Sequence, residues 1–366
     1  MKNKNIVTVI VFIALLASLS LGSWLKPQTA FSEAERRPLA EKPMISIETV
    51  LGGEFMNEFE KYSTDQFPLR EPFRRIKAFF STYIFKQKDN NGLFTEDGHI
   101  FKTEYPVNPD MVNYAKERFD YIYNTYLKNT DVKTYISIVP DKNYFLSDDA
   151  GYLKIDYDAF IDDFKEKLEY MSYIDIIPLL SLDDYYRTDS HWKQESICDI
   201  AEFLADVMGT DVKSDYEIKT LKNPFRGVYL GQSALAFEPD TIKYLTNDIL
   251  SSATVNYFGT GKAAAGDMYN MDKANGKDPY EMFLSGTEAL VEIVNPNAKS
   301  DKELIIFRDS YASSLAPLFV PGYKKVTLVD VRYIQSSFIG NFIEFDDQDV
   351  LFIYSSTLLN NASAMR

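Results

Sequence analysis

The sequence predicts an α/β protein in which a parallel sheet is covered by helices on both faces. Short apolar runs such as residues 132–139 (VKTYISIV) and 304–307 (LIIF) are typical of buried strands. Segments with apolar residues three and four positions apart lie between these runs and predict helices. Apolar strands that alternate with helices pair in parallel, because each crossover helix returns the chain to the same end of the sheet.

The N-terminus predicts a membrane-spanning helix. Residues 6–25 carry no charge and consist mostly of Val, Ile, Leu, Phe and Ala, with Lys2 and Lys4 before them and Lys26 after. About 20 apolar residues suffice to cross a bilayer. The basic residues before the span favour a cytoplasmic N-terminus with the body of the protein exported. The alternative is a signal peptide that is cleaved at residues 20–22 (SLG), which would release the protein outside the cytoplasm.

The remaining elements follow along the chain. Residues 27–45 form a charged, Pro-containing linker, and residues 45–85 show helical spacing of apolar side chains. Turn signals at residues 90–92 and 97–98 flank a short strand, and residues 100–101 form the next one. We expect helices at 111–127, 160–171, 197–207 and 315–319, and strands at 132–139, 173–177, 304–307, 326–331 and 350–354. The expected domains are an anchor at 1–26, a lead-in of linker, helices and hairpin at 27–108, and a catalytic domain at 109–366, in which 223–277 is a possible insertion.

Composition excludes several classes of function. The chain has 366 residues and 45% hydrophobic residues, enough for a sizeable core. A formal net charge of −15 argues against nucleic-acid binding. The single cysteine, Cys198, excludes an internal disulfide and a cysteine-built zinc site. No metal-ligand spacing occurs, so we expect no metal and no cofactor.

Three residues carry the predicted chemistry. His191 is one of two histidines in the chain, and Asp189 lies two positions before it, where a carboxylate can orient and charge an imidazole base. Ser310 follows the apolar run at 304–307 and opens a predicted helix, which aims its hydroxyl at the edge of the sheet where ligands bind. Each residue also has a simpler explanation: Asp309 or Ser310 can cap the helix, and His191 can be structural. His99, in the turn at 97–99, is expected to be structural.

Several short motifs follow one another in a set order between roughly residues 33 and 355. Their segments are residues 35–40, 59–70, 91–101, 139–142, 188–192, 278–286, 309–312 and 330–333. The order of these motifs resembles that of the DHHW-motif family, whose members are SGNH-hydrolase-like and are related to the alginate O-acetylation proteins. Ser190 stands where the naming motif has its first histidine, so any auxiliary role of that histidine is lost, whereas the Asp-x-His spacing is kept.

The resemblance implies a three-layer SGNH-like fold and an Asp189–His191–Ser310 triad that forms an acyl-serine intermediate. It implies an extracytoplasmic O-acyltransferase, with acetyl as the expected group and a cell-surface polysaccharide as acceptor. A multi-pass membrane acyltransferase would supply the acyl group. The alternatives are a carbohydrate acetyl esterase with the same triad and a non-catalytic glycan-binding or assembly subunit. Residues expected to contact the oxyanion or substrate are Gly286, Lys142, Arg332 and Tyr333. For Arg332, an ion pair with Asp330 is an equal alternative, and for Lys142 a solvated strand end.

Overall fold

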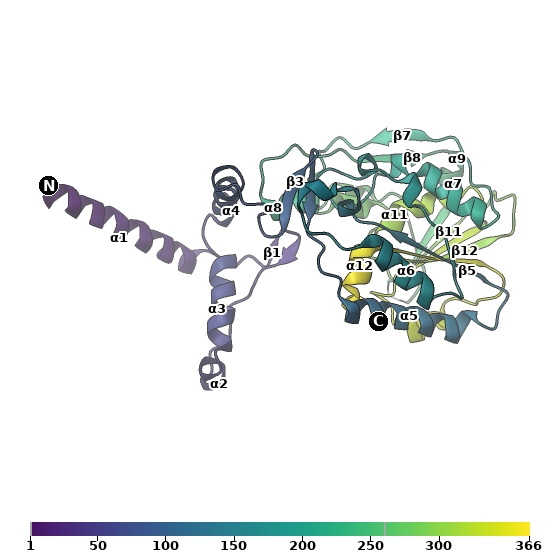
Figure 1. Cartoon of the computed structure of the whole chain (residues 1–366), viewed down its shortest axis with the longest axis horizontal. Helices are drawn as coiled ribbons and strands as arrows, with labels where there is room; N and C mark the ends of the chain where they lie inside the picture. The colour runs from purple at the N-terminus through teal and green to yellow at the C-terminus, as the bar shows by residue number, and fades with distance from the viewer. Residues whose placement is uncertain (1, 260) are drawn as a thin grey trace. The chain divides into compact units, whose positions relative to one another are not determined.

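The computed structural model describes residues 2–259 and 261–366, which form two compact units. The N-terminal unit comprises Met1–Leu93 and Val228–Glu238, and the sheet unit comprises Phe94–Gly227 and Pro239–Arg366. Figure 1 shows the whole chain, coloured by residue number from the N-terminus to the C-terminus. The functional division expected from the sequence, at residues 26 and 108 with an insertion at 223–277, stays a prediction.

The sheet unit is built on one eight-stranded sheet. Five of its strands are mutually parallel, and three antiparallel strands extend one edge. The strands, in order across the sheet, are β10 (Ala264–Gly266), β9 (Thr254–Tyr257), β11 (Leu290–Val294), β13 (Lys325–Val329), β12 (Glu303–Arg308), β14 (Asp349–Ser355), β5 (Lys133–Val139) and β6 (Ser172–Tyr173). The strand β12 lies inside the parallel part, between β13 and β14, where both of its faces are covered.

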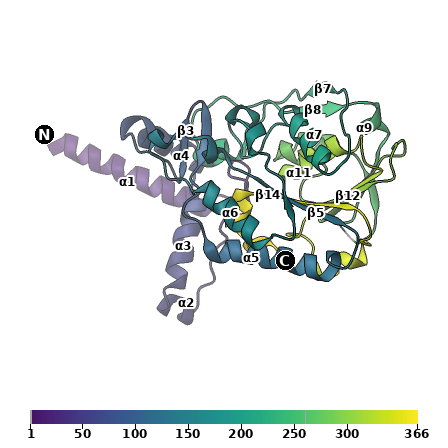
Figure 2. The same cartoon turned by 45° about the vertical axis from the view of Figure 1, so that its right-hand side comes forward.

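Helices cover both faces of this sheet, and Figures 1 and 2 show α5 and α6 on the side opposite to α7 and α11. The fold class expected from the sequence, a three-layer α/β arrangement, is confirmed. The helices of the unit are α5 (Pro109–Ile122, continued by a π-helical turn at Tyr123–Leu127), α6 (Tyr157–Lys167), α7 (Cys198–Val207), α9 (Asp248–Ser252), α10 (Met271–Ala274), α11 (Tyr311–Leu315, continued by a 3₁₀ turn at Ala316–Phe319) and α12 (Ser356–Asn360).

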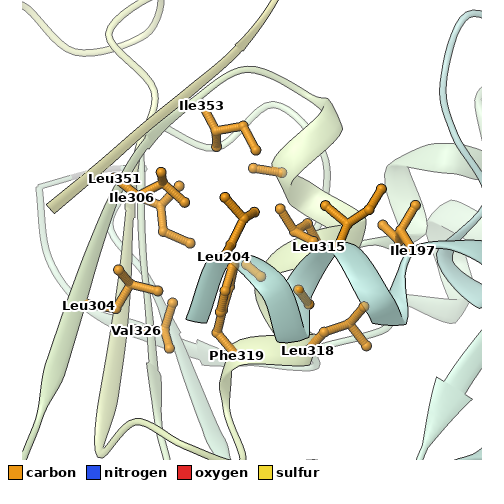
Figure 3. Packing of buried hydrophobic residues seen from close by; sticks show 14 of the residues in the cluster. Ile197, Leu204, Leu304, Ile306, Leu315, Leu318, Phe319, Val326, Leu351 and Ile353 are labelled. Carbon is orange, nitrogen blue, oxygen red and sulfur yellow. The ribbon is translucent and has the colours of Figure 1, made fainter. Parts of the chain in front are cut away.

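Alternate side chains of each central strand enter different cores. In β12, Leu304 and Ile306 pack against Leu204 of α7, as Figure 3 shows, whereas Ile305 and Phe307 pack under α5 and α6. This alternation follows from the two-residue repeat of a strand. Because both faces are apolar, the strand reads as a continuous hydrophobic run, which explains why the sequence predicted it.

The antiparallel edge of the sheet was not predicted. In β11, Glu292 interrupts the apolar run and is half-buried, so this strand lacks the pattern of a buried parallel strand. Its neighbours β9 and β10 lie within residues 223–277, the region expected to be a possible insertion. So does β8 (Lys243–Thr246), which pairs with β7 (Glu217–Thr220), just before that region. The strand expected at 173–177 is shorter than predicted, since only the two residues of β6 pair with β5.

The hairpin expected around residue 97 is present as β3 (Leu93–Glu96) and β4 (His99–Lys102). Asp97 and Gly98 form its turn, and both have positive φ angles, which Gly and Asp tolerate better than most residues. His99 is buried in this hairpin, and its Nδ1 lies 3.1 Å from the carbonyl oxygen of Asp97.

The N-terminal unit begins with an exposed apolar helix. Residues Lys4–Ser23 form a span long and apolar enough to cross a membrane, and none of that span is buried within the protein. The helices of this unit are α1 (Lys2–Leu25), α2 (Ile47–Leu51), α3 (Glu54–Asp65), α4 (Arg70–Phe79, continued by a π-helical turn at Phe80–Ile84) and α8 (Val228–Ser233), and its short strand pair is β1 (Phe31–Ser32) with β2 (Arg37–Pro38).

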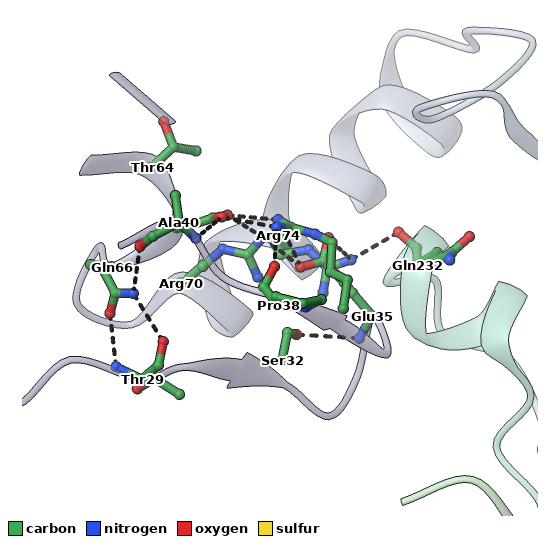
Figure 4. Close-up of polar contacts among 12 residues, drawn as sticks. Thr29, Ser32, Glu35, Pro38, Ala40, Thr64, Gln66, Arg70, Arg74 and Gln232 are labelled. Carbon is green, nitrogen blue, oxygen red and sulfur yellow. Dashed lines mark hydrogen bonds and ion pairs between the residues drawn. The ribbon is translucent and has the colours of Figure 1, made fainter. Parts of the chain in front are cut away.

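Polar contacts hold the N-terminal unit together. The Asp65 carboxylate accepts two hydrogen bonds from the Arg37 guanidinium, at 2.6 and 2.9 Å, and a third from the backbone N–H of Ala40. Gln66 donates to the carbonyl oxygens of Thr29 and Ala40 (Figure 4). The helices α3 and α4 are therefore joined to the preceding linker by buried and half-buried polar side chains.

Candidate active site

Ser310 lies directly after a central parallel strand. The chain leaves β12 at Arg308, turns at Asp309 and enters α11 at Tyr311. The Asp309 carboxylate accepts from the N–H of Tyr311 at 3.0 Å and from the N–H of Ser355, at the end of β14, at 2.8 Å. Asp309 therefore fixes the turn, whereas the Ser310 side chain makes no capping hydrogen bond to its own helix. The Ser310 hydroxyl is available for a different contact.

The three residues selected from the sequence form one chain of hydrogen bonds. The Ser310 hydroxyl oxygen lies 2.8 Å from His191 Nε2, and His191 Nδ1 lies 2.6 Å from Asp189 Oδ1. Asp189 is fully buried, whereas 13% of the His191 side chain is exposed. An Nδ1–H that donates to the carboxylate leaves Nε2 as an acceptor for the serine proton, which is the tautomer a general base needs.

Two tyrosines frame the imidazole. The ring of Tyr280 stacks on His191 with 3.9 Å between centroids and 14° between planes, and its hydroxyl lies 2.9 Å from Ser314 Oγ. The Tyr311 hydroxyl donates to the carbonyl oxygen of Ser190 at 2.6 Å. These contacts hold the imidazole between a buried ring and the segment that bears it, so the base has little freedom to turn away from Ser310.

The loop that carries Asp189 is held by a buried carboxylate. Asp240 accepts hydrogen bonds from the backbone N–H groups of Arg187 and Thr188 and from the Thr188 hydroxyl, at 3.1, 2.7 and 2.6 Å. The Thr188 hydroxyl oxygen in turn accepts a hydrogen bond from the N–H of Gly227 at 3.0 Å. A Cβ built on Gly227 would lie 2.2 Å from the Thr188 carbonyl oxygen and 2.6 Å from Asp189 Cβ. Only glycine therefore fits beside the Asp189 segment.

Lys142 also holds the loop that carries Asp189. Its ammonium group donates to the carbonyl oxygens of Ile100, Tyr186 and Arg187, at 2.5, 3.1 and 3.3 Å. Burial lowers the pKa of Lys142 to about 7, although neighbouring carboxylates, including Asp189, act in the opposite direction. Only 2% of the residue is exposed, so contact between Lys142 and a substrate would require this loop to open.

The segment that carries His191 is also joined directly to the helix that follows Ser310. The Trp192 indole N–H lies 3.0 Å from both the carbonyl oxygen of Tyr311 and the hydroxyl of Ser314. The Gln194 amide donates to the carbonyl oxygen of Ser314 at 2.8 Å. Both donors are buried, where a lost hydrogen bond is expensive, and they keep His191 in register with Ser310.

The other predicted contact residues lie in different surroundings. The Gly286 N–H donates to the carbonyl oxygen of Phe283 at 3.1 Å, so it is already engaged in a turn. Arg332 forms a two-point ion pair with Asp330, at 2.8 and 2.6 Å, which is the structural alternative stated from the sequence. Tyr333 is 45% exposed, and the Arg332 guanidinium lies 5.4 Å from its ring centroid. Of these three, Tyr333 has the exposure that a substrate contact needs.

The sequence did not single out Arg308, although it has a supporting role. Its guanidinium is fully buried and donates to Ser313 Oγ at 2.8 Å and to the carbonyl oxygens of Gly286 and Glu288, at 3.2 and 3.3 Å. It thereby joins the Gly286 turn to the end of β12, just before Ser310. An arginine at the end of an otherwise apolar strand, ELIIFR, was the available signal.

Tyr280, Asp240 and Gly227 were also missed as site residues, because their contacts join segments far apart in the chain. Among the described residues, no group of three or more His, Cys, Asp and Glu side chains is arranged to hold a metal ion.

The comparisons with known proteins bear on the fold. No protein-family model and no curated protein matches the sequence. A DHHW family protein from Eubacterium siraeum superposes with a TM-score of 0.61 at 22% identity, over 75% of this chain and 95% of that one. This chain has the fold of a DHHW family protein. The resemblance drawn from the sequence motifs is thus confirmed at the level of the fold.

Bacillus cereus PatB1 has the same fold. Its structure with a sulfonyl adduct gives a TM-score of 0.57 at 16% identity, covering 73% of this chain and 95% of that chain. A second PatB1 structure gives 0.56 at 16% identity, covering 74% and 97%. Each of these solved chains is matched over almost its whole length, so the likeness is one of overall fold.

Proposed function

We propose that this protein is an extracytoplasmic O-acyltransferase that transfers an acyl group, in the simplest case acetyl, to a cell-surface polysaccharide. The observation that carries the proposal is the continuous hydrogen-bonded path from Asp189 through His191 to Ser310, in which His191 and Ser310, 119 positions apart, meet at the end of a central strand. The motif order shared with DHHW proteins and with the alginate O-acetylation proteins supports acyl transfer to a glycan in particular.

The first half of the reaction forms an acyl-serine. Ser310 Oγ attacks the carbonyl carbon of an acyl donor while His191 Nε2 takes the hydroxyl proton. The tetrahedral intermediate collapses, the bond to the donor's leaving group breaks, and the leaving group takes the proton from His191. Asp189 stabilises the positive charge that the imidazole carries between these two steps.

The second half transfers the acyl group to the acceptor. A sugar hydroxyl attacks the acyl-serine carbonyl as His191 Nε2 takes its proton, and that proton returns to Ser310 Oγ when the ester bond to the enzyme breaks. The backbone N–H of Ser310 is the expected first donor to the oxyanion. Water in place of the sugar would give hydrolysis, so the same triad also serves a carbohydrate esterase.

The proposed location is the outer side of a membrane, with α1 as a single-pass anchor. The apolar span Lys4–Ser23 and the lysines that precede it support this orientation. A multi-pass acyltransferase as the acyl donor remains part of the proposal. Mass analysis of the mature protein tests the anchor, because retention of residues 1–22 supports it, whereas cleavage near Gly22 would make α1 a signal peptide.

The experiment that tests the function supplies an activated acetyl ester, with and without an oligosaccharide acceptor. The expected result is acetylated oligosaccharide from the wild-type protein, and neither transfer nor ester hydrolysis from Ser310→Ala. Ser252→Ala, which removes an exposed hydroxyl of α9, is the matched control and should behave as wild type. Free acetate as the sole product with acceptor present would favour the esterase. Undiminished turnover in Ser310→Ala would remove the enzyme proposal.

A further inference from the structure

The helix α4 exposes the side that a helix of a soluble protein normally buries. Its apolar residues and those of the following π-helical turn recur three and four positions apart and form one stripe. Each is about half exposed: Phe73 44%, Ile76 52%, Phe79 51%, Phe80 45%, Tyr83 53% and Ile84 53%. This stripe, which we call the α4 apolar face, therefore packs against little of the N-terminal unit.

The opposite face of α4 is polar and faces the interior of the N-terminal unit. Arg70 Nη2 lies 2.5 Å from Glu35 Oε2 and 3.2 Å from Asp65 Oδ1. Arg74 Nη2 donates to the carbonyl oxygen of Gly231 at 2.9 Å and to that of Gln232 at 2.8 Å, and Figure 4 shows the contact with Gln232. Turning the helix to bury its apolar face would break these contacts and leave unpaired charges, which is costly. The outward direction of the α4 apolar face is thus fixed.

Exposed basic residues accompany this face in a chain whose formal net charge is −15. Residues 69–88 contain six basic residues and one acidic residue, Glu71. Arg70 and Arg74 are paired with Glu35, Asp65 and Glu71, whereas the other four basic residues are exposed. By helical spacing, the exposed Arg75 and Lys77 lie on opposite flanks of the α4 apolar face. The six basic residues are Arg70, Arg74, Arg75, Lys77, Lys86 and Lys88.

The start of α4 lies beside the outer end of the candidate membrane span. A Cβ built on Gly22 of α1 would lie 3.6 Å from Cγ of Pro68, two residues before α4 begins. The span itself ends at Ser23. If α1 crosses the bilayer, the level of Gly22 is the level of the lipid headgroups, so α4 begins there as well.

We propose that the segment from Arg70 to Phe85 is an interfacial helix that binds the membrane surface. The α4 apolar face enters the boundary between headgroups and acyl chains, and the flanking cations contact anionic phospholipid headgroups. A protein partner could also cover an apolar face, but the local excess of basic residues favours an anionic lipid surface. This inference extends the proposed location of the protein and does not depend on its acyl chemistry.

The test uses the full chain in vesicles of pure lipid, with a polarity-sensitive fluorophore on a single cysteine. In a Cys198→Ala background, Phe80→Cys reports the α4 apolar face, Leu15→Cys reports α1, and Phe203→Cys, at an exposed apolar position on α7, is the matched control. We expect a blue shift and a several-fold gain of emission at position 80 in phosphatidylglycerol vesicles. Position 203 should show the emission of a label in water.

The outcomes separate the interfacial helix from the anchor. A label at position 80 that stays in water while position 15 is immersed would overturn the inference and leave the anchor standing. Immersion at position 80 alone would support the inference and remove the anchor, and water at both positions would overturn both. The change at position 80 should be smaller in phosphatidylcholine vesicles and in the Arg75→Gln, Lys77→Gln double variant. Equal changes in both lipids would overturn the role of anionic headgroups.

Discussion

The two units of this protein distribute polar and apolar side chains in opposite ways. The sheet unit buries apolar residues on both faces of its sheet, and Asp189, His191 and Ser310 meet beyond the end of β12. In the N-terminal unit, α4 directs Arg70 and Arg74 inward and its phenylalanines outward. Helical spacing of apolar residues is present in both units, so the spacing defines a face of a helix but not what that face contacts.

The difference indicates that the two units are adapted to different surroundings. An apolar interior stabilises a fold in water, because burial removes apolar surface from solvent. A unit with exposed apolar faces and a polar interior does not obtain this stabilisation in water. It is stabilised when those apolar faces enter lipid. The candidate site depends on the rigid apolar interior of the sheet unit. The proposed interfacial helix depends on the polar interior of the N-terminal unit.

The largest expected effect is on the chemistry of the sheet unit. Asp189→Asn keeps the size of the side chain but removes the charge that selects the imidazole tautomer. In serine proteases the corresponding change lowers kcat about 10⁴-fold, and we expect a loss on the order of 10³- to 10⁴-fold in ester turnover here. Steady-state kinetics measure it, and an unchanged circular dichroism spectrum is the control. A loss of less than tenfold would mean that this carboxylate does not serve a base.

The second effect compares how much an apolar side chain contributes to the free energy of unfolding in the core of the sheet unit and on the exposed face of α4. Leu204→Ala, in the core of the sheet unit, should lower the free energy of unfolding by about 2–5 kcal/mol, since it leaves a cavity among buried side chains. Ile76→Ala, on the exposed face of α4, should change it by less than about 0.5 kcal/mol in lipid-free solution. Denaturant unfolding measures both. Similar losses in the two variants would contradict the inverted polarity of α4.

The third effect concerns Gly227, which lies against the Asp189 segment. Gly227→Ala places a methyl group within 2.6 Å of Asp189 Cβ, so the Asp189 segment must shift. A displacement of about 1 Å at a catalytic group costs on the order of 100-fold in rate. The expected result is a loss of that size in kcat with the fold retained. Gly259→Ala, where the new Cβ would meet only the end of the Glu288 side chain, is the control and should keep full activity.

The smallest effect tests the polar interior of the N-terminal unit through pH. The hydrogen bonds from Arg37 lower the pKa of Asp65 to about 2. A lowered carboxyl pKa stabilises the folded state above the unfolded pKa near 4, and this contribution is lost as pH falls from about 4 towards 2. Because the Arg37 side chain is partly exposed and water screens the pair, we expect Asp65→Asn to destabilise the α3–α4 region by no more than about 1 kcal/mol at pH 7. Hydrogen exchange of these amides measures it, and the difference from wild type should shrink below about pH 4.

The sequence predicted the parallel strands well because their composition records burial on both faces. The strands β5, β12 and β14 begin and end within one or two residues of the expected positions. The antiparallel strand β11 was missed because Glu292 breaks its apolar run. The outward direction of α4 could not be predicted, since it depends on contacts of Arg74 with Gly231 and Gln232, more than 150 positions away.

The residues of the candidate site also fall into two groups, those that the sequence predicts and those that it does not. Asp189, His191 and Ser310 were selected because their residue types and local order suit acyl chemistry. Tyr280 and Gly227 act through contacts that the chain makes only after folding. Tyr280 lies in one of the segments that resemble the family, residues 278–286, but nothing in that segment indicates that its ring stacks on His191. Lys142 was noticed as a cation, but its three carbonyl partners lie on other segments of the sheet unit, so its supporting role was not apparent.

The most direct test of the central claim measures whether the Ser310 hydroxyl is activated. Sulfonyl fluorides modify serines whose proton is drawn away by a neighbouring base, and PatB1, which shares this fold, has been solved with a sulfonyl adduct. Peptide mass analysis after treatment should find the modification at Ser310 in the wild-type protein, and little or none at this position in His191→Ala. Equal labelling of Ser310 in both proteins, or a folded wild-type protein that is never modified there, would contradict the account.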